Sequence, residues 1–196
     1  MTTYIPKIVT LPYDVFASPT ASVLLPIALG TAVGYSTRPK KTEETYTAMK
    51  QPPLRPPPYV FGPVWTALYG LMGYATHRAV TLTSSSPSLA SSASVSAADL
   101  QALYSVQLGL NLAWMPLFFG LRRPALAFAD IVSLAGLNGY LTYLYFKVDN
   151  AAGWCMVPYL AWLSFATYLN AGVGYLNRWD ISESTLATRK ALGKDQ

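Results

Sequence analysis

The sequence has few of the residues that build polar catalytic centres. Its 196 residues include one cysteine, Cys155, one histidine, His77, and only 12% charged residues. A single cysteine excludes an internal disulfide, and a single histidine excludes most metal and catalytic sites built on several histidines. Charged residues make up about a quarter of an average soluble domain. With 52% hydrophobic residues and a mean hydropathy of +0.28, the composition predicts a protein surrounded by lipid.

Five stretches are long and apolar enough for transmembrane helices, for which about 20 residues suffice. Strands of a membrane barrel run about 9 to 11 residues with strict alternation, which these stretches lack. The predicted helices cover residues 19–35, 59–82, 100–120, 125–148 and 153–176. We therefore expect an all-α integral membrane bundle over residues 19–177. An N-terminal lead, residues 1–18, precedes it and a cytosolic tail, residues 178–196, follows it.

The links between the predicted helices differ in composition. Residues 36–58 are rich in charge and end in a proline-dense run, residues 51–58, which we expect to be extended chain. Residues 83–99 are mostly Ser and Ala without Lys or Arg, which predicts a flexible loop. Arg122 and Arg123 mark a tight turn before Pro124.

The net charge of +5 is distributed unequally between the two predicted faces of the membrane. Eleven basic residues share the face of the first link, the third link and the tail: Arg38, Lys40, Lys41, Lys50, Arg55, Arg122, Arg123, Arg178, Arg189, Lys190 and Lys194. Only Lys7, Arg78 and Lys147 share the other face. Because Lys and Arg concentrate on the cytoplasmic side of membrane proteins, we expect a cytosolic C-terminus. The charge then reflects topology and does not indicate nucleic-acid binding.

Three of the predicted helices carry a stripe of aromatic or polar residues on one face. The stripes are Trp65, Tyr69 and Met72; Gln107, Asn111 and Trp114; and Trp162, Ala166, Leu169 and Asn170. Polar side chains that face lipid are costly, so the amides should face the bundle interior. Each stripe fits either helix packing with interhelical hydrogen bonds or contact with a ligand, and the spacing leaves both interpretations open.

Several isolated residues are weaker candidates. Asp130 is the only carboxylate inside a predicted span, which makes it either a functional group or a structural one satisfied by a neighbouring helix. His77 could ligate haem iron, although a lone histidine near the membrane interface is more often solvated. No other metal ligand is predicted. Val173, Tyr175 and Arg178 fit the loose apolar, tyrosine and basic pattern proposed for sterol contact.

Motifs in three of the predicted helices occur in a characteristic order between about residues 50 and 177. They are Pro56-Pro57 with Phe61-Gly62-Pro63-Val64-Trp65 and Tyr69; Gln107, Asn111, Trp114, Pro116 and Phe118-Phe119-Gly120; and Pro158-Tyr159-Leu160-Ala161-Trp162 with Leu169-Asn170. In residues and spacing the chain resembles the translocator protein family, also called tryptophan-rich sensory proteins, peripheral benzodiazepine receptors or TspO/MBR.

The resemblance implies a five-helix membrane domain over residues 19–177 whose pocket opens toward the cytosol beneath the first link, which acts as a lid. Family members bind porphyrin and haem, animal members also bind cholesterol, and some bacterial members degrade protoporphyrin in light. The ligand-binding residues implied here are Trp65, Asn111, Trp114, Trp162, Ala166 and Leu169. Further candidates are Phe61, Gly62, Tyr69, Gln107, Asp130 and Asn170. The resemblance also implies residence in the mitochondrial outer membrane, or alternatively the endoplasmic reticulum or another secretory membrane, and homodimers.

The chain departs from the family at several aromatic positions. Leu54, Leu112 and Leu126 stand where the family has tryptophan, and Ala171 and Gly172 stand where animal members have tyrosines. In the family, the tryptophan that stands at the position of Leu126 usually contacts drug-like ligands. These departures therefore favour porphyrin over drugs or sterols as the ligand.

Three functions remain to be distinguished. The first is a membrane receptor or carrier for tetrapyrroles, with sterol as a second ligand and with no required cofactor. The second is an enzyme that degrades protoporphyrin with light and oxygen, in which Trp65 and Trp162 take part. The third is a structural membrane adaptor, which predicts no saturable porphyrin binding.

Overall fold

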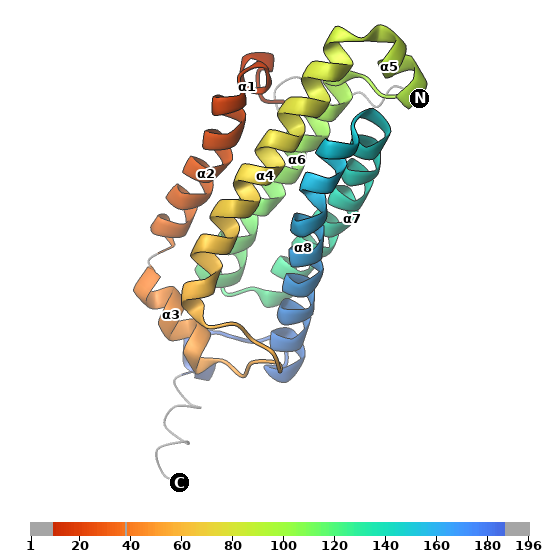
Figure 1. The fold of residues 1–196 in the computed structure, drawn as a ribbon. Coiled ribbons are helices and arrows are strands. Elements are labelled where there is room, and N and C mark those ends of the chain that lie inside the picture. The colour runs from red at the N-terminus through yellow and green to blue at the C-terminus, as the bar shows by residue number, and fades with distance from the viewer. Residues whose placement is uncertain (1–9, 38, 187–196) are drawn as a thin grey trace.

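In the part of the chain that the structure describes, five long helices run side by side and form a bundle (Figure 1). The computed structural model describes residues 10–37 and 39–186, which contain helices and no strand. The long helices are α2 (Pro19–Ser36), α4 (Pro58–Ser85), α6 (Ala97–Met115), α7 (Pro124–Val148) and α8 (Asn150–Leu176). A π-helical turn, η2 (Pro116–Gly120), extends α6. The predicted all-α class is confirmed, and each predicted helix is found within a few residues of its expected ends.

The helix starts follow from residues whose backbone or side chain suits the first turn. Proline begins α2, α4 and α7, where a missing N–H costs nothing because first-turn N–H groups have no helical partner. Ser96 and Asp99 form a reciprocal capping box at the start of α6. Asp149 caps α8 by accepting a hydrogen bond from the Ala152 N–H, at 3.0 Å.

Three short helices lie in segments where the sequence predicted none. They are α1 (Tyr13–Ala17), α3 (Pro39–Ala48) and α5 (Pro87–Ala93). The prediction of a flexible loop over residues 83–99 is wrong, because α5 follows α4, and Ala93 at its end and Val95 after it are buried in the core. The expected extended chain at residues 51–58 is interrupted by a turn in which Leu54 adopts a φ of 65°.

Packing differs along the length of the bundle. The main core joins α4, α6, α7 and α8, and its fully buried side chains include Met72, Tyr145 and Tyr159. Gly73 allows α4 to touch the backbone of α2 at Ser22, because a Cβ at this position would overlap the Ser22 carbonyl. A second, smaller cluster consists of Met49, Phe118, Ala127, Val173, Ile181 and Leu186. It joins the first link, η2 and the chain that follows α8.

The three expected cytosolic segments meet at one end of the bundle. Figure 1 shows α3 and the last turns of α8 at this end and α1 and α5 at the opposite one. Arg122, after η2, pairs with Glu183 at 3.2 Å, and the Lys50 N–H donates to the Asn177 side chain, at 3.1 Å. Residues 1–9 of the predicted lead and residues 187–196 of the predicted tail lie outside the described residues, as do Lys7, Arg38, Arg189, Lys190, Lys194 and the side chains of Lys40 and Lys41.

Two helical segments in the described part of the chain, Ala97–Gly120 and Pro124–Val148, are long and apolar enough to cross a membrane by length and composition. They correspond to the third and fourth predicted spans. For α2, α4 and α8 the membrane-spanning role stays a prediction.

Candidate functional site

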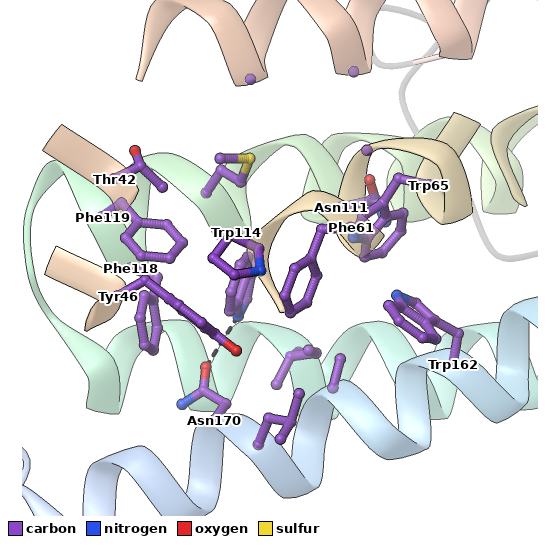
Figure 2. Close-up of a pocket in the computed structure, with 18 of the residues that line it drawn as sticks. Thr42, Tyr46, Phe61, Trp65, Asn111, Trp114, Phe118, Phe119, Trp162 and Asn170 are labelled. Carbon is purple, nitrogen blue, oxygen red and sulfur yellow. Dashed lines mark hydrogen bonds between the residues drawn. The ribbon is translucent and has the colours of Figure 1, made fainter. Parts of the chain in front are cut away.

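A cavity of about 680 Å³ lies between the long helices near the α3 end of the bundle (Figure 2). Its wall includes all six residues first assigned to ligand binding: Trp65, Asn111, Trp114, Trp162, Ala166 and Leu169. Phe61, Gly62, Tyr69 and Asn170, from the wider candidate set, line it as well. Side chains from α4, α6 and α8 therefore converge on one space, as the stripes on these helices suggested.

The aromatic wall is built from edge and stacking contacts that fix the ring planes. Trp65 lies 5.6 Å from Tyr69 and 6.1 Å from Tyr159 between ring centroids. Trp162 meets Phe61 edge-on at 6.0 Å, and Trp114 stacks on Phe118 at 4.9 Å. Such contacts stabilise aromatic pairs beyond the area that they bury. The rings therefore form a preformed wall.

The indole N–H groups of two of these tryptophans have different surroundings. Trp114 donates to Asn170 Oδ1 at 3.0 Å, and Asn170 Nδ2 donates to the Pro124 carbonyl at 3.1 Å, so this N–H fastens α6 to α8 (Figure 2). The Trp162 Nε1 is buried and has no hydrogen-bond partner among the described residues. A buried donor without a partner costs about 1–3 kcal/mol. An acceptor on a bound molecule would remove that cost.

A hydrogen-bonded network lies next to the inner part of the cavity. Tyr69 donates to Asn111 Oδ1 at 2.6 Å, and Asn111 Nδ2 donates to the Tyr159 hydroxyl at 2.8 Å. The Tyr159 hydroxyl donates to Gln107 Oε1 at 3.2 Å, which also accepts from Asn138 Nδ2 at 3.3 Å. Both groups of the Asn111 amide are thus used within the protein. Asn111 therefore positions the wall of the cavity, and these bonds leave one amide hydrogen and one carbonyl lone pair for a ligand.

The mouth of the cavity is formed by α3, the link after it and the start of α4. Thr42, Glu43, Tyr46 and Gln51 line it, and among the described residues Glu43 is the one charged side chain on the cavity wall. The Tyr46 hydroxyl donates to the Pro56 carbonyl at 2.8 Å. Burial raises the pKa of Tyr46, and the nearby charge of Arg55 partly opposes this rise.

Some predicted residues are not brought to the cavity. Gln107 lies fully buried in the network described above, and Asp130 is half-buried on α7 away from the cavity wall. Of the sterol pattern only Val173 lines the cavity, whereas Tyr175 is 80% exposed and Arg178 is also exposed.

The weak haem-ligand candidate, His77, lies elsewhere. Its Nδ1 is 2.6 Å from the Phe16 carbonyl of α1, at the opposite end of the bundle. In the described part of the chain, no three His, Cys, Asp or Glu side chains are grouped as a metal site would require.

Other residues of the cavity wall were not predicted from the sequence as site residues. Gly30 and Gly34 of α2 line the cavity four residues apart, a spacing visible in the sequence that carries no chemistry of its own. Thr42, Glu43 and Tyr46 reach the mouth because α3 is a helix that the sequence analysis did not predict. Phe118 and Phe119 belong to a motif that the sequence did reveal, and η2 turns both toward the cavity.

Comparison with known proteins gives consistent matches. A family model described as TspO/MBR family matches residues 22–176. The chain is 42% identical over 169 residues to the Translocator protein homolog of Schizosaccharomyces pombe, covering 84% of this chain and 98% of that one. It is 36% identical over 125 residues to the Translocator protein of Homo sapiens, covering 64% and 70%. It is 35% identical over 144 residues to the Tryptophan-rich sensory protein of Cereibacter sphaeroides, covering 74% and 83%.

Proposed function

The chain belongs to the TspO/MBR family of membrane proteins, and from this premise we propose that it is a receptor or carrier that binds a tetrapyrrole, protoporphyrin or haem, in its cavity. The observation that carries the proposal is the cavity wall itself. Trp65, Trp114 and Trp162 surround one space of about 680 Å³. That volume lies within the roughly 300–1,000 Å³ of small-molecule sites, and flat indoles suit a flat aromatic macrocycle.

The distribution of polar groups supports a ligand that is largely apolar. The Asn111 amide and the Trp114 N–H already have partners within the protein. The buried Trp162 N–H has no partner in the described part of the chain and would be satisfied by an acceptor on the ligand. The acidic groups of a porphyrin would lie toward the mouth, close to Tyr46, on which the charge of Arg55 acts.

The proposal includes an arrangement in the membrane. All five long helices span it, the α3 end faces the cytosol, and the C-terminus is cytosolic. We place the protein in the mitochondrial outer membrane, with the endoplasmic reticulum or another secretory membrane as the alternative, and as a homodimer. Sterol is a second ligand class with weaker support, because only Val173 of its sequence pattern lies on the cavity wall.

One observation favours an enzyme as the second candidate. Trp65 and Trp162, the two residues of the photo-oxidation hypothesis, lie on the wall of the same cavity. Purified protein illuminated with protoporphyrin in air should then form a bilin-like product, and Trp162→Phe should not. Quenching of porphyrin fluorescence without a product favours the receptor or carrier.

The experiment that tests the proposal is a fluorescence titration of detergent-solubilised protein with protoporphyrin. We expect saturable binding that weakens by at least about tenfold when Trp65 and Trp162 are both changed to Leu, because two stacking surfaces are lost. Trp154→Leu is the matched control, because Trp154 is 66% exposed and does not line the cavity. Equal affinity in the double variant and the control would exclude this cavity as the porphyrin site.

A further inference from the structure

We propose that Asn177 is a positioning residue that latches the link after α3 to the end of α8, and that the opening of this latch sets how fast a ligand leaves the cavity. The second half of this inference rests on the proposed binding function. The latch consists of the contacts between residues 50–53 and Tyr168, Gly172 and Asn177.

The central contact is a pair of hydrogen bonds between one buried amide and one backbone residue. The Lys50 N–H donates to Asn177 Oδ1 at 3.1 Å, and Asn177 Nδ2 donates to the Lys50 carbonyl at 2.8 Å. Asn177 is fully buried, and its Nδ2 also donates to the Val173 carbonyl at 2.7 Å, which orients the amide. The Asn177 side chain therefore holds the backbone N–H and the backbone carbonyl of Lys50 in one position.

Lys50 is flanked by two residues of the cavity wall. Met49 and Gln51 both line the cavity, and Met49 is only 3% exposed. Asn177 itself does not line the cavity. It therefore acts on the wall through the backbone of Lys50.

Two further contacts hold the same link to α8. Tyr168 donates to the Pro53 carbonyl at 3.1 Å. Gly172 lies against Pro52 so closely that a Cβ there would be 2.6 Å and 2.8 Å from two ring carbons. Figure 1 shows the link crossing the end of α8. Gly172 is thus a second point at which one methyl group would push the link away.

Two hydrogen bonds connect Tyr46 of α3 with the link that follows it. Gln51 Nε2 donates to the Tyr46 carbonyl at 2.6 Å, and the Tyr46 hydroxyl donates to the Pro56 carbonyl at 2.8 Å. Breaking the latch would therefore loosen α3 and the link together, with Met49 in the second cluster as a remaining anchor, while α4, α6, α7 and α8 keep their mutual packing. Such a change speeds both entry and exit and leaves the affinity for the ligand nearly unchanged.

The test uses two variants that loosen the latch by different means, Asn177→Ala and Gly172→Ala. Gly136→Ala on α7 is the matched control, because a Cβ there meets nothing within 4 Å. The first measurement needs no ligand: the hydrogen exchange rate of the Lys50 amide should rise roughly tenfold in both variants, because its acceptor is removed or displaced. The second is stopped-flow fluorescence with protoporphyrin, in which association and dissociation rates should rise together by a similar factor.

The outcomes separate the latch from the binding function. Faster exchange at Lys50 with unchanged dissociation rates would overturn the role of the latch in ligand release, and unchanged exchange would overturn the latch itself. If either variant bound protoporphyrin more weakly only because association slowed, the substitution would have distorted the cavity wall. That result would also contradict the proposal. If the unmodified protein bound no protoporphyrin, the proposed function and the ligand-release role would both fail, while the exchange measurement would still decide whether Asn177 anchors the link.

Discussion

The half of the bundle near α1 and the half near α3 are built from the same helices but pack in opposite ways. In the first half α2 and α4 touch at Ser22 and Gly73, and Met72, Tyr104 and Tyr145 fill the interior. In the second half Gly34 and Gly62 both line the cavity, and a Cβ on either would meet nothing within 4 Å. Glycine therefore brings α2 and α4 together at Gly73, whereas Gly34 and Gly62 leave open space beside the cavity. The groups that face each glycine determine whether it makes a close contact or borders open space.

The largest effect should come from filling the contact that closes the first half. Gly73→Leu would force α2 and α4 apart, because a Cβ at this position already overlaps the Ser22 backbone. We expect a loss of about 3 kcal/mol of stability, the upper range for overpacking. Unfolding of the purified protein in detergent measures it. Gly109→Leu is the matched control, because Gly109 is exposed with open space around it. Similar losses in both variants would mean that the close contact at Gly73 is not the cause of the loss.

The next effect distinguishes two tryptophans of the cavity half. Trp162→Phe removes an N–H that has no partner among the described residues and replaces the indole with a smaller ring. The gain from the first change should offset the loss from the second, so stability should stay nearly constant while porphyrin affinity falls about tenfold. Trp114→Phe breaks the bond to Asn170 and should cost about 1 kcal/mol of stability with little change in affinity. Paired melting and titration experiments test this. The reverse pattern would show that Trp114, not Trp162, serves the ligand.

A third effect depends on pH and concerns the closed half. The hydrogen bond from Arg78, at 2.6 Å, holds the pKa of Asp149 below its usual value of about 3.9. Because the pKa of Asp149 is lower in the folded state than in the unfolded state, the ion pair stabilises the protein above about pH 4. This stabilisation is lost as the pH falls through the folded-state pKa. Arg78→Gln should lower stability by about 1 kcal/mol at neutral pH. The difference between variant and parent should shrink below pH of about 4, as melting temperatures across pH would show. A difference that did not vary with pH would rule out the ion pair as its cause.

The smallest effect concerns the charges at the cavity mouth. Glu43→Gln should strengthen binding of a porphyrin dicarboxylate about twofold to threefold, because one repulsive charge is removed from a solvated wall. Arg55→Gln should weaken it by a similar factor. The dimethyl ester of the same porphyrin should respond to neither change. Equal responses of the acid and the ester would show that the carboxylates lie away from the mouth.

Much of the fold followed from residue patterns that act locally. Continuous apolar stretches and the prolines at positions 19, 58 and 124 locate the long helices, and helical spacing places Trp162, Ala166, Leu169 and Asn170 on one face of α8. Helical spacing shows which residues share a face, but it does not show at which depth of the bundle each residue lies. Gln107 and Asn111 share a face, yet only Asn111 reaches the cavity, because Gln107 lies one turn further into the packed half.

Long-range contacts could not be read from the sequence. The Asn177 amide meets Lys50 across 127 residues, and nothing near either residue indicates its partner. The short helix α3 was hidden because its charged sequence resembles a solvated link, and its position at the mouth depends on contacts with the proline-rich segment.

The latch also constrains the order in which the site can be assembled during synthesis. Lys50 emerges from the ribosome long before Asn177, and the α8 side of the cavity wall is made in the same late interval. Until α8 has packed against the other helices, the link has no partner to dock on and Trp65 faces an unfinished wall. The cavity is therefore complete only once all of α8 is in place, and a chain released before residue 177 would carry most of the apolar surface but would lack the Asn177 bonds to Lys50.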